Sequence, residues 1–144
     1  MSKKPRLALI VATAFVLVAC GSSDDGGSGA TGATAPSSDR PSSTAKLAIV
    51  APKVGEVVHG SSVHLRVNLQ GARIVPATTT NIVPDEGHLH VLLDDTLISM
   101  TQGTEQTIRN ITPGPHRIQV EFVASDHAPF APRVVAVVPF EVEP

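Results

Sequence analysis

The feature that most constrains the fold of this chain is an alternation of apolar and polar side chains between residues 46 and 144. In SSVHLRVNL, residues 61–69, Val63, Leu65, Val67 and Leu69 alternate with polar side chains, as in a β-strand that buries one face. No part of this region shows the 3.6-residue apolar repeat of an amphipathic helix. Short apolar runs between Pro, Gly and Ser turns predict further strands over residues 46–52, 87–95, 104–111, 115–124 and 133–142.

These strands predict an all-β fold. The region is long enough for one compact domain, since domains of about 100 residues are common. Several short strands joined by turns favour an immunoglobulin-like antiparallel β-sandwich over a barrel or an α/β fold. The chain has one cysteine and no tryptophan, which excludes the antibody subtype with its disulfide bond and core tryptophan. We therefore expect an immunoglobulin-like β-sandwich domain over residues 46–144.

Residues 1–19 have the features of an export signal. Lys3, Lys4 and Arg6 precede an apolar run at residues 7–18 that is too short for a comfortable membrane span. The sequence LVAC at the end of this segment resembles the lipobox of bacterial lipoproteins, in which the chain is cut before the cysteine and the cysteine is acylated. Cys20 is the only cysteine, so it cannot form an internal disulfide. We expect a lipid on Cys20 to anchor the protein in the cell membrane or the outer membrane, facing the extracytoplasmic side.

A polar segment separates Cys20 from the predicted domain. Residues 20–45 are almost entirely Gly, Ser, Thr, Ala, Pro and Asp. Such a segment cannot bury enough apolar surface to offset its conformational entropy, so we expect a flexible linker. About 25 residues of this composition span on the order of 25–30 Å on average. Loss of the three basic residues of the signal would change the formal net charge from −2 to −5, and so acidic a chain is not expected to bind nucleic acid.

Two histidines, His88 and His90, open the apolar run GHLHVLLDD. By strand parity they point away from the better apolar face of that strand. If this strand runs antiparallel to the one at residues 115–124, as in an immunoglobulin-like order, the loop after the second strand returns to the end that carries the histidines. A transition metal, Cu²⁺ or Zn²⁺, suits such a site, although the spacing alone does not identify the cofactor. The candidate ligands are His88, His90, Asp126 and His127.

A simpler interpretation stays open, because His-x-His occurs by chance in many strands. The histidines would then be solvated or hydrogen bonded, and Asp126 and His127 would cap a turn. The protein would be a non-metal interaction domain or a structural domain of the envelope. His59 and His64 have no evident partner in the sequence. The chain has no nucleophile elbow and no phosphate-binding Gly-rich loop, so we expect no catalytic residues and no enzymatic activity.

His116 is expected to have a structural role. It follows the turn TPGP and shares the parity of Ile118 and Val120, which are expected in the core. Sandwich domains often place an aromatic residue with a polar tip at such a corner, where it bonds the nearby backbone. We expect His116, with Pro113 and Gly114, to form a corner at the end of the sandwich far from His88.

Three segments, GHLHVLLDD, ITPGPHRIQVEF and ASDHAPFAPRVVAVVPFEV, together resemble an exported bacterial family known only as domain of unknown function number 4399. The members of that family show a GHxH strand, a PGxH strand and an Asp…His segment before a closing strand. The resemblance covers Gly87 to Val142, and Leu89 stands where the family often has a further histidine. It implies no activity. The positions that match the family are Gly87, His88, His90, Asp94, Pro113, Gly114, His116 and His127.

Overall fold

The computed structural model describes residues 40–76 and 80–144, so the expected signal peptide, Cys20 and most of the expected linker lie outside the described residues. In the part that is described, all regular structure is β-strand, as predicted, and no helix is long and apolar enough to cross a membrane. The strands are β1 (Lys46–Ala51), β2 (Glu56–His59), β3 (Ser62–Gln70), β4 (Arg73–Ile74), β5 (Glu86–Leu93), β6 (Thr96–Thr101), β7 (Glu105–Arg109), β8 (Gly114–Ala124) and β9 (Pro129–Glu143).

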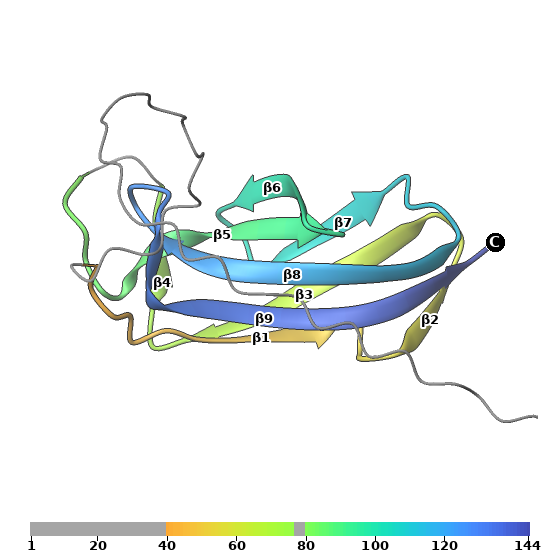
Figure 1. Ribbon diagram of the computed structural model, residues 1–144, viewed down its shortest axis with the longest axis horizontal. Helices are drawn as coiled ribbons and strands as arrows, with labels where there is room; N and C mark the ends of the chain where they lie inside the picture. The colour runs from red at the N-terminus through yellow and green to blue at the C-terminus, as the bar shows by residue number, and fades with distance from the viewer. Residues whose placement is uncertain (1–39, 77–79) are drawn as a thin grey trace, which may run out of the picture. The chain divides into compact units, whose positions relative to one another are not determined.

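The strands form two sheets, one in front of the other (Figure 1). The smaller sheet has the order β1-β3-β7, and the larger has the order β2-β9-β8-β5-β4, with β6 also paired to β5. This arrangement confirms the predicted β-sandwich. The sequence did not predict β2, β4 and β6. The first two have only four and two residues, and β6 has neighbouring exposed apolar residues, Leu97 and Ile98, that break the alternation.

The core lies between the two sheets, where strand parity placed it. In β3, Val63, Leu65 and Val67 are buried, while the polar residues between them are exposed. They belong to one cluster with the inward-facing residues of β5, β8 and β9. Within this cluster the rings of Phe122 and Phe130 are stacked, with their centroids 5.6 Å apart. The sandwich is therefore held by side chains that alternate along its strands, as burial of apolar surface requires.

The pairing of β5 with β8 decides which residues meet at each end of the larger sheet. The two strands are antiparallel, with His88 opposite Val123 and Leu93 opposite Ile118. The loop after β8 therefore starts beside the first residues of β5, and His116 lies at the other end of β8. Both placements agree with the expectation from an immunoglobulin-like strand order.

The compact domain begins earlier than the sequence indicated. Ser43 Oγ donates a hydrogen bond to the carbonyl of Pro84, and Thr44 Oγ1 donates one to the carbonyl of Gly71, each 2.6 Å long. Residues 40–45, which we expected in the flexible linker, thus lie against the domain. The amino-acid composition did not predict this contact, because the segment is held by hydrogen bonds of polar residues and not by a run of apolar side chains.

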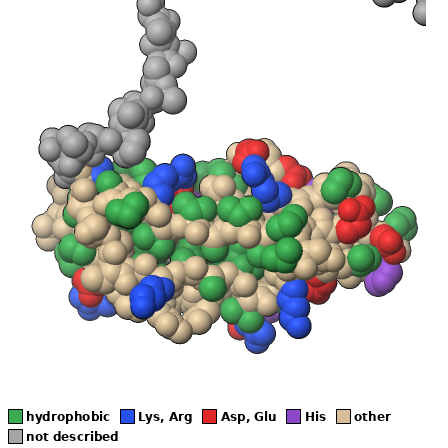
Figure 2. All heavy atoms as spheres, turned by 60° about the horizontal axis from the view of Figure 1, so that its bottom comes forward, with side chains coloured by type: hydrophobic (Ala, Val, Ile, Leu, Met, Phe, Trp, Pro, Cys, Tyr) green, Lys and Arg blue, Asp and Glu red, His purple; other side chains and the backbone are tan. Residues whose placement is uncertain are grey.

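The surface carries charges of both signs. On the face drawn in Figure 2, Lys, Arg, Asp and Glu side chains are scattered around small groups of hydrophobic side chains. No single basic patch dominates this face.

Candidate metal centre

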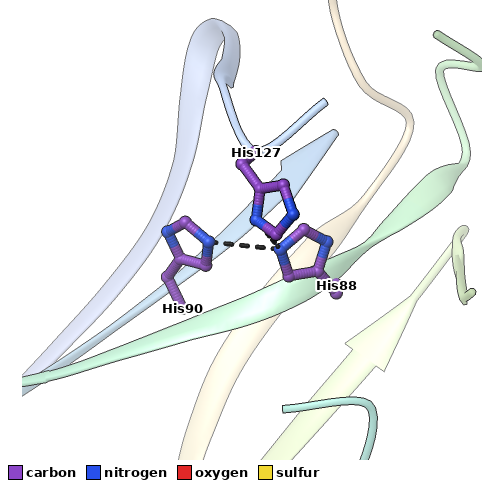
Figure 3. Close-up of side chains that lie close together, drawn as sticks. All are labelled: His88, His90 and His127. Carbon is purple, nitrogen blue, oxygen red and sulfur yellow. Dashed lines mark hydrogen bonds between the residues drawn. The ribbon is translucent and has the colours of Figure 1, made fainter. Parts of the chain in front are cut away.

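Three imidazole rings meet where β5 begins and β8 ends (Figure 3). His88 Nε2 lies 3.1 Å from His90 Nε2 and 3.0 Å from His127 Nδ1. One nitrogen from each ring lies within 4.8 Å of the other two. We call His88, His90 and His127 the histidine triad. The structure thus brings together three of the four candidate ligands, from two segments 39 residues apart in the chain.

The three rings differ in exposure because they occupy different positions. His88 is buried, with 2 % of its surface exposed, although strand parity put it on the outer face. His90 is half-buried, and His127 is exposed on the turn between β8 and β9. The expectation that His88 points away from the sandwich core did not anticipate this burial, because parity describes the faces of a sheet and not what covers them.

Hydrogen bonds between the neutral rings cannot account for both short nitrogen–nitrogen contacts of the triad without a further group. A neutral imidazole has one N–H donor and one lone pair. If His88 Nε2 is the donor, it can serve only one of its two neighbours. If it is the acceptor, its single lone pair faces two rings, and the proton sits on His88 Nδ1, which is buried and has no hydrogen-bond partner among the described residues. Neither tautomer satisfies both of these short contacts.

Burial keeps the inner rings of the triad neutral. Burial, together with the nearby His127 and His90, lowers the pKa of His88 to about 4. Burial also lowers the pKa of His90, helped by His127 and opposed by Glu121. Both rings are therefore unprotonated at neutral pH, which is the form that binds a metal.

A carboxylate lies beside the triad on the same face of the sheet. Glu121 is opposite His90 in the register of β5 and β8 and is buried, with 5 % exposed. Arg133 holds it by two hydrogen bonds of 2.7 and 2.5 Å, from Nε and Nη2. This bidentate pair places the charge of Arg133 against the Glu121 carboxylate beside His90. The sequence did not single out Glu121 or Arg133.

Asp126, the fourth candidate ligand, does not join the triad. Its Oδ2 and Oδ1 accept hydrogen bonds of 2.5 and 3.0 Å from Arg40 Nη1 and Nη2. Oδ1 also accepts a hydrogen bond from the backbone N–H of Ala128. The hydrogen bond from Arg40 is the largest of the effects that lower the pKa of Asp126. Asp126 therefore caps the turn, as in the simpler interpretation, while its neighbour His127 reaches the triad.

His116 lies at the opposite end of β8 and makes a separate set of contacts. Its Nδ1 is 2.7 Å from Asp94 Oδ2, and its Nε2 is 2.7 Å from the carbonyl oxygen of Thr112. Both partners are acceptors, so the ring can donate to both only as an imidazolium. Burial lowers the pKa of His116, but the hydrogen bonds to Asp94 and Thr112 outweigh it and raise the pKa overall. The backbone contact expected at this corner is present.

The residues around His116 complete the corner. Asp94 Oδ1 accepts the backbone N–H of Arg117, so one carboxylate joins the turn after β5 to the start of β8. Gly114, the first residue of β8, has φ 128°, a conformation that other residues rarely adopt. Pro113 precedes it in the loop before β8. These motif positions thus belong to a corner of the fold and not to the triad.

The other two histidines lie near carboxylates that the sequence did not indicate. His59 Nδ1 is 3.7 Å from Glu143 Oε2, and His64 Nε2 is 3.8 Å from Glu105 Oε2. All four side chains are more than half exposed, so these pairs contribute little to stability. Neither histidine belongs to the triad.

Comparison with known proteins gives a family but no activity. Residues 3–144 match the model of a family described as "Family of unknown function (DUF6130)". The family number 4399, expected from the motifs, is not confirmed. A search of curated proteins finds no match.

Three solved structures are similar to parts of this chain. The fibronectin(III)-like modules of Clostridium thermocellum CbhA share 20 % identity at a TM-score of 0.47, covering 67 % of this chain and 93 % of theirs. The PKD domain of human KIAA0319 shares 15 % identity at a TM-score of 0.43, covering 78 % and 93 %. The CARDB domain of PF1109 from Pyrococcus furiosus shares 16 % identity at a TM-score of 0.42, covering 71 % and 96 %.

Proposed function

The chain belongs to DUF6130, a family of unknown function, and we propose that it is a metal-binding lipoprotein. In this proposal His88, His90 and His127 hold one Cu²⁺ or Zn²⁺ ion at the end of a β-sandwich. The protein binds the metal and catalyses no reaction. A lipid on Cys20 anchors it in a membrane, with the domain on the extracytoplasmic side.

The observation that carries the metal proposal is the position of His88 Nε2, 3.0 and 3.1 Å from a nitrogen of each of the other two rings. Nitrogens bound to one Zn²⁺ at about 2.0–2.1 Å lie about 3.3 Å apart in a tetrahedral site. The two short separations are close to this value. A cation between the rings would accept one lone pair from each of the three nitrogens. No arrangement of protons on neutral rings gives all three nitrogens a partner at this point.

The backbone at His127 supports the same proposal. His127 has φ 65°, in the left-handed region where a residue with a Cβ carries a penalty of about 1 kcal/mol. Asn or Gly would suit a turn at this position better than most residues, although His is also tolerated there. A histidine held in this conformation and aimed at two other histidines is better explained by binding than by turn formation.

The donor set indicates the class of metal. Three imidazole nitrogens are borderline ligands that suit Zn²⁺ and Cu²⁺, whereas Mg²⁺ and Ca²⁺ prefer oxygen. With three protein ligands, a fourth position is left for water or for a group from a partner. Because His127 is exposed, this side of the site is open to solvent.

Calorimetric titration of the purified full-length chain at pH 7.5 tests the metal proposal. We expect Cu²⁺ and Zn²⁺ each to bind with a stoichiometry of one, and Mg²⁺ and Ca²⁺ to give no heat of binding. The nitrogen-only donor set is the reason for this difference. If neither Cu²⁺ nor Zn²⁺ binds, the proposal is wrong, and an interaction domain or a structural envelope domain becomes the better interpretation.

The anchoring proposal rests on the sequence of residues 1–20 and has its own test. We expect Cys20→Ala to move the protein from the detergent phase to the aqueous phase in a phase-partition experiment, because the thiol is the acyl acceptor and stable anchoring needs acyl chains. Ser22→Ala, two residues away, serves as the control and should partition like the parent. If the Cys20→Ala variant stays with the detergent phase, the lipoprotein assignment fails and the metal proposal is unaffected.

A further inference from the structure

The turn that carries His127 is held by a residue far away in the sequence. Arg40 Nη1 and Nη2 donate to the two carboxylate oxygens of Asp126, over 2.5 and 3.0 Å. Its Nη2 also donates to the carbonyl of Ala128, and its Nε donates to the carbonyl of Pro129, each over 2.9 Å. The Arg40 side chain is 15 % exposed. All of these hydrogen bonds reach residues within two positions of His127.

Arg40 is fixed to the domain as well as to the turn. The backbone N–H of Ala131, in β9, donates to the carbonyl of Pro41 over 3.0 Å. The Thr44 carbonyl lies so close to Gly71 that a Cβ on Gly71 would be only 2.6 Å from its oxygen. The segment from Arg40 to Thr44 therefore lies against the sandwich at more than one point, and the guanidinium group is attached to a fixed part of the backbone.

The turn needs such support because it supplies one ligand to a site whose other two ligands lie on β5. His88 and His90 are positioned by the strand pairings of the larger sheet. The position of His127 depends on a tight turn, closed by backbone hydrogen bonds between Ala124 and Ala128 and from His127 to Ala124. A guanidinium group with a fixed fork of donors can lock both the carboxylate and the carbonyls of this turn, which the single ammonium group of lysine cannot do.

We infer that Arg40 is a positioning residue of the metal site, which holds the turn around Asp126 so that His127 faces His88 and His90. This inference rests on the proposed function, since it assigns a role in a site proposed above. Metal binding and docking of the Arg40 segment are then coupled, so each stabilises the other. The segment before β1 is thus part of the site and not only a connection to it.

The test compares copper binding by the full-length parent with binding by Arg40→Ala, Arg40→Lys and Arg117→Ala. Loss of a residue that orients a ligand typically weakens metal binding by 10–100-fold, and we expect about tenfold weaker binding for Arg40→Ala. Arg40→Lys should restore only part of this loss, because it keeps the charge without the fork. Arg117→Ala is the matched control, since Arg117 pairs with an acidic residue, Asp95, at the far end of β8. The affinity of this variant for copper should equal that of the parent.

Two further readouts separate positioning from general stability. In copper(II) EPR spectra with protein in excess, the nitrogen couplings should fall from three in the parent to two in Arg40→Ala. In NMR spectra of the metal-free chain, contacts between the His127 and His88 rings should be present in the parent and lost in Arg40→Ala. Equal affinity and unchanged spectra for Arg40→Ala would overturn the inference, even if its melting temperature were lower.

The proposed function and this inference fail in different ways. If the parent does not bind copper, the proposed function is wrong, and the metal-free NMR comparison alone then decides whether Arg40 positions His127. If the parent binds copper and Arg40→Ala binds it equally well with unchanged spectra, the metal proposal stands and the role assigned to Arg40 is wrong.

Discussion

Gly87→Ala should destabilise the domain more than any other single exchange at the glycines between Gly55 and Gly114. A Cβ at Gly87 would lie 2.0 Å from the carbonyl oxygen of Val123 and 3.0 Å from Phe122 Cζ. Both neighbours are buried in β8, which pairs with β5 at this point, so neither can move without opening the sheet. Overpacking of this kind typically costs 1–3 kcal/mol, and we expect about 3 kcal/mol, or roughly 15 °C in the melting temperature of a domain of this size.

Gly103→Ala is the matched control for this exchange. A Cβ at Gly103 would meet its nearest neighbours, Thr101 Oγ1 and the Glu105 carbonyl oxygen, at 3.7 and 3.8 Å, which is ordinary contact. Its melting temperature should therefore stay within a few degrees of that of the parent. If thermal unfolding followed by circular dichroism showed the same melting temperature for Gly87→Ala and Gly103→Ala, the close approach of β5 and β8 described here would be wrong.

Gly87 also shows what kind of information the sequence could supply. The motif resemblance marked Gly87 together with His88 and His90, but gave no reason for a glycine there. The structure supplies one, because the backbone of β8 occupies the space of a side chain. A larger residue at Gly87 would displace the start of β5, where His88 is buried. The glycine and the histidines of this motif are therefore linked by the packing of one strand pair.

Alternation predicted the larger part of the fold, because it records directly which face of a strand is buried. The buried residues of β3 follow it, but in β8 Glu121 and Val123, on the face opposite Val120 and Phe122, are buried as well. The antiparallel pairing of β5 and β8 brought His127 to His88 as expected. The short strands β2 and β4 were missed because two to four residues do not establish a period. The burial of His88 was missed because it depends on what covers the outer face.

Two polar residues show the limit of sequence reasoning for the site. Asp126 stands next to a triad histidine and was a reasonable candidate ligand, yet its carboxylate is directed to Arg40. Arg40 lies in a stretch whose composition is typical of a flexible linker. No local pattern connects positions separated by 86 residues. Their contact is a result of the tertiary fold, so it could only be found in the structure.

The largest effect on ligand binding should come from the histidine triad. Metal that binds only the folded chain stabilises it by RT ln(1 + [L]/Kd), which is about 2.7 kcal/mol at a metal concentration one hundred times Kd. We expect Cu²⁺ or Zn²⁺ to raise the melting temperature of the parent at pH 7.5 accordingly. His88→Ala, His90→Ala and His127→Asn should each lose most of this increment. Asn is chosen at His127 because Ala would be strained at its φ of 65°.

Two other histidines serve as controls for the same measurement. His64→Ala should keep both the melting temperature and the metal increment, since His64 is exposed on β3 and outside the triad. His116→Ala should lower the melting temperature without metal, because it removes the contacts to Asp94 and Thr112, and should retain the metal increment. Equal loss of the increment in His64→Ala would show that the metal binds elsewhere.

The dependence on pH gives the last distinction between a metal site and a set of hydrogen-bonded rings. Protons compete with metal for imidazole. Because burial lowers the pKa of His88 to about 4 and also lowers that of His90, the increment should fade in acid, as the pH falls toward 4. The buried His88 has a pKa lowered to about 4. Its folded pKa lies below its unfolded value, so it contributes stability above pH 6.5 that is lost as the pH falls toward 4. His116, whose pKa is raised, acts in the opposite sense, because its contribution to stability is present at low pH and is lost as the pH rises through its folded pKa.

Melting temperatures of the parent measured from pH 4 to pH 8, with and without Zn²⁺, should therefore diverge toward neutral pH and converge in acid. Curves that coincide over the whole range would mean that the triad holds no metal.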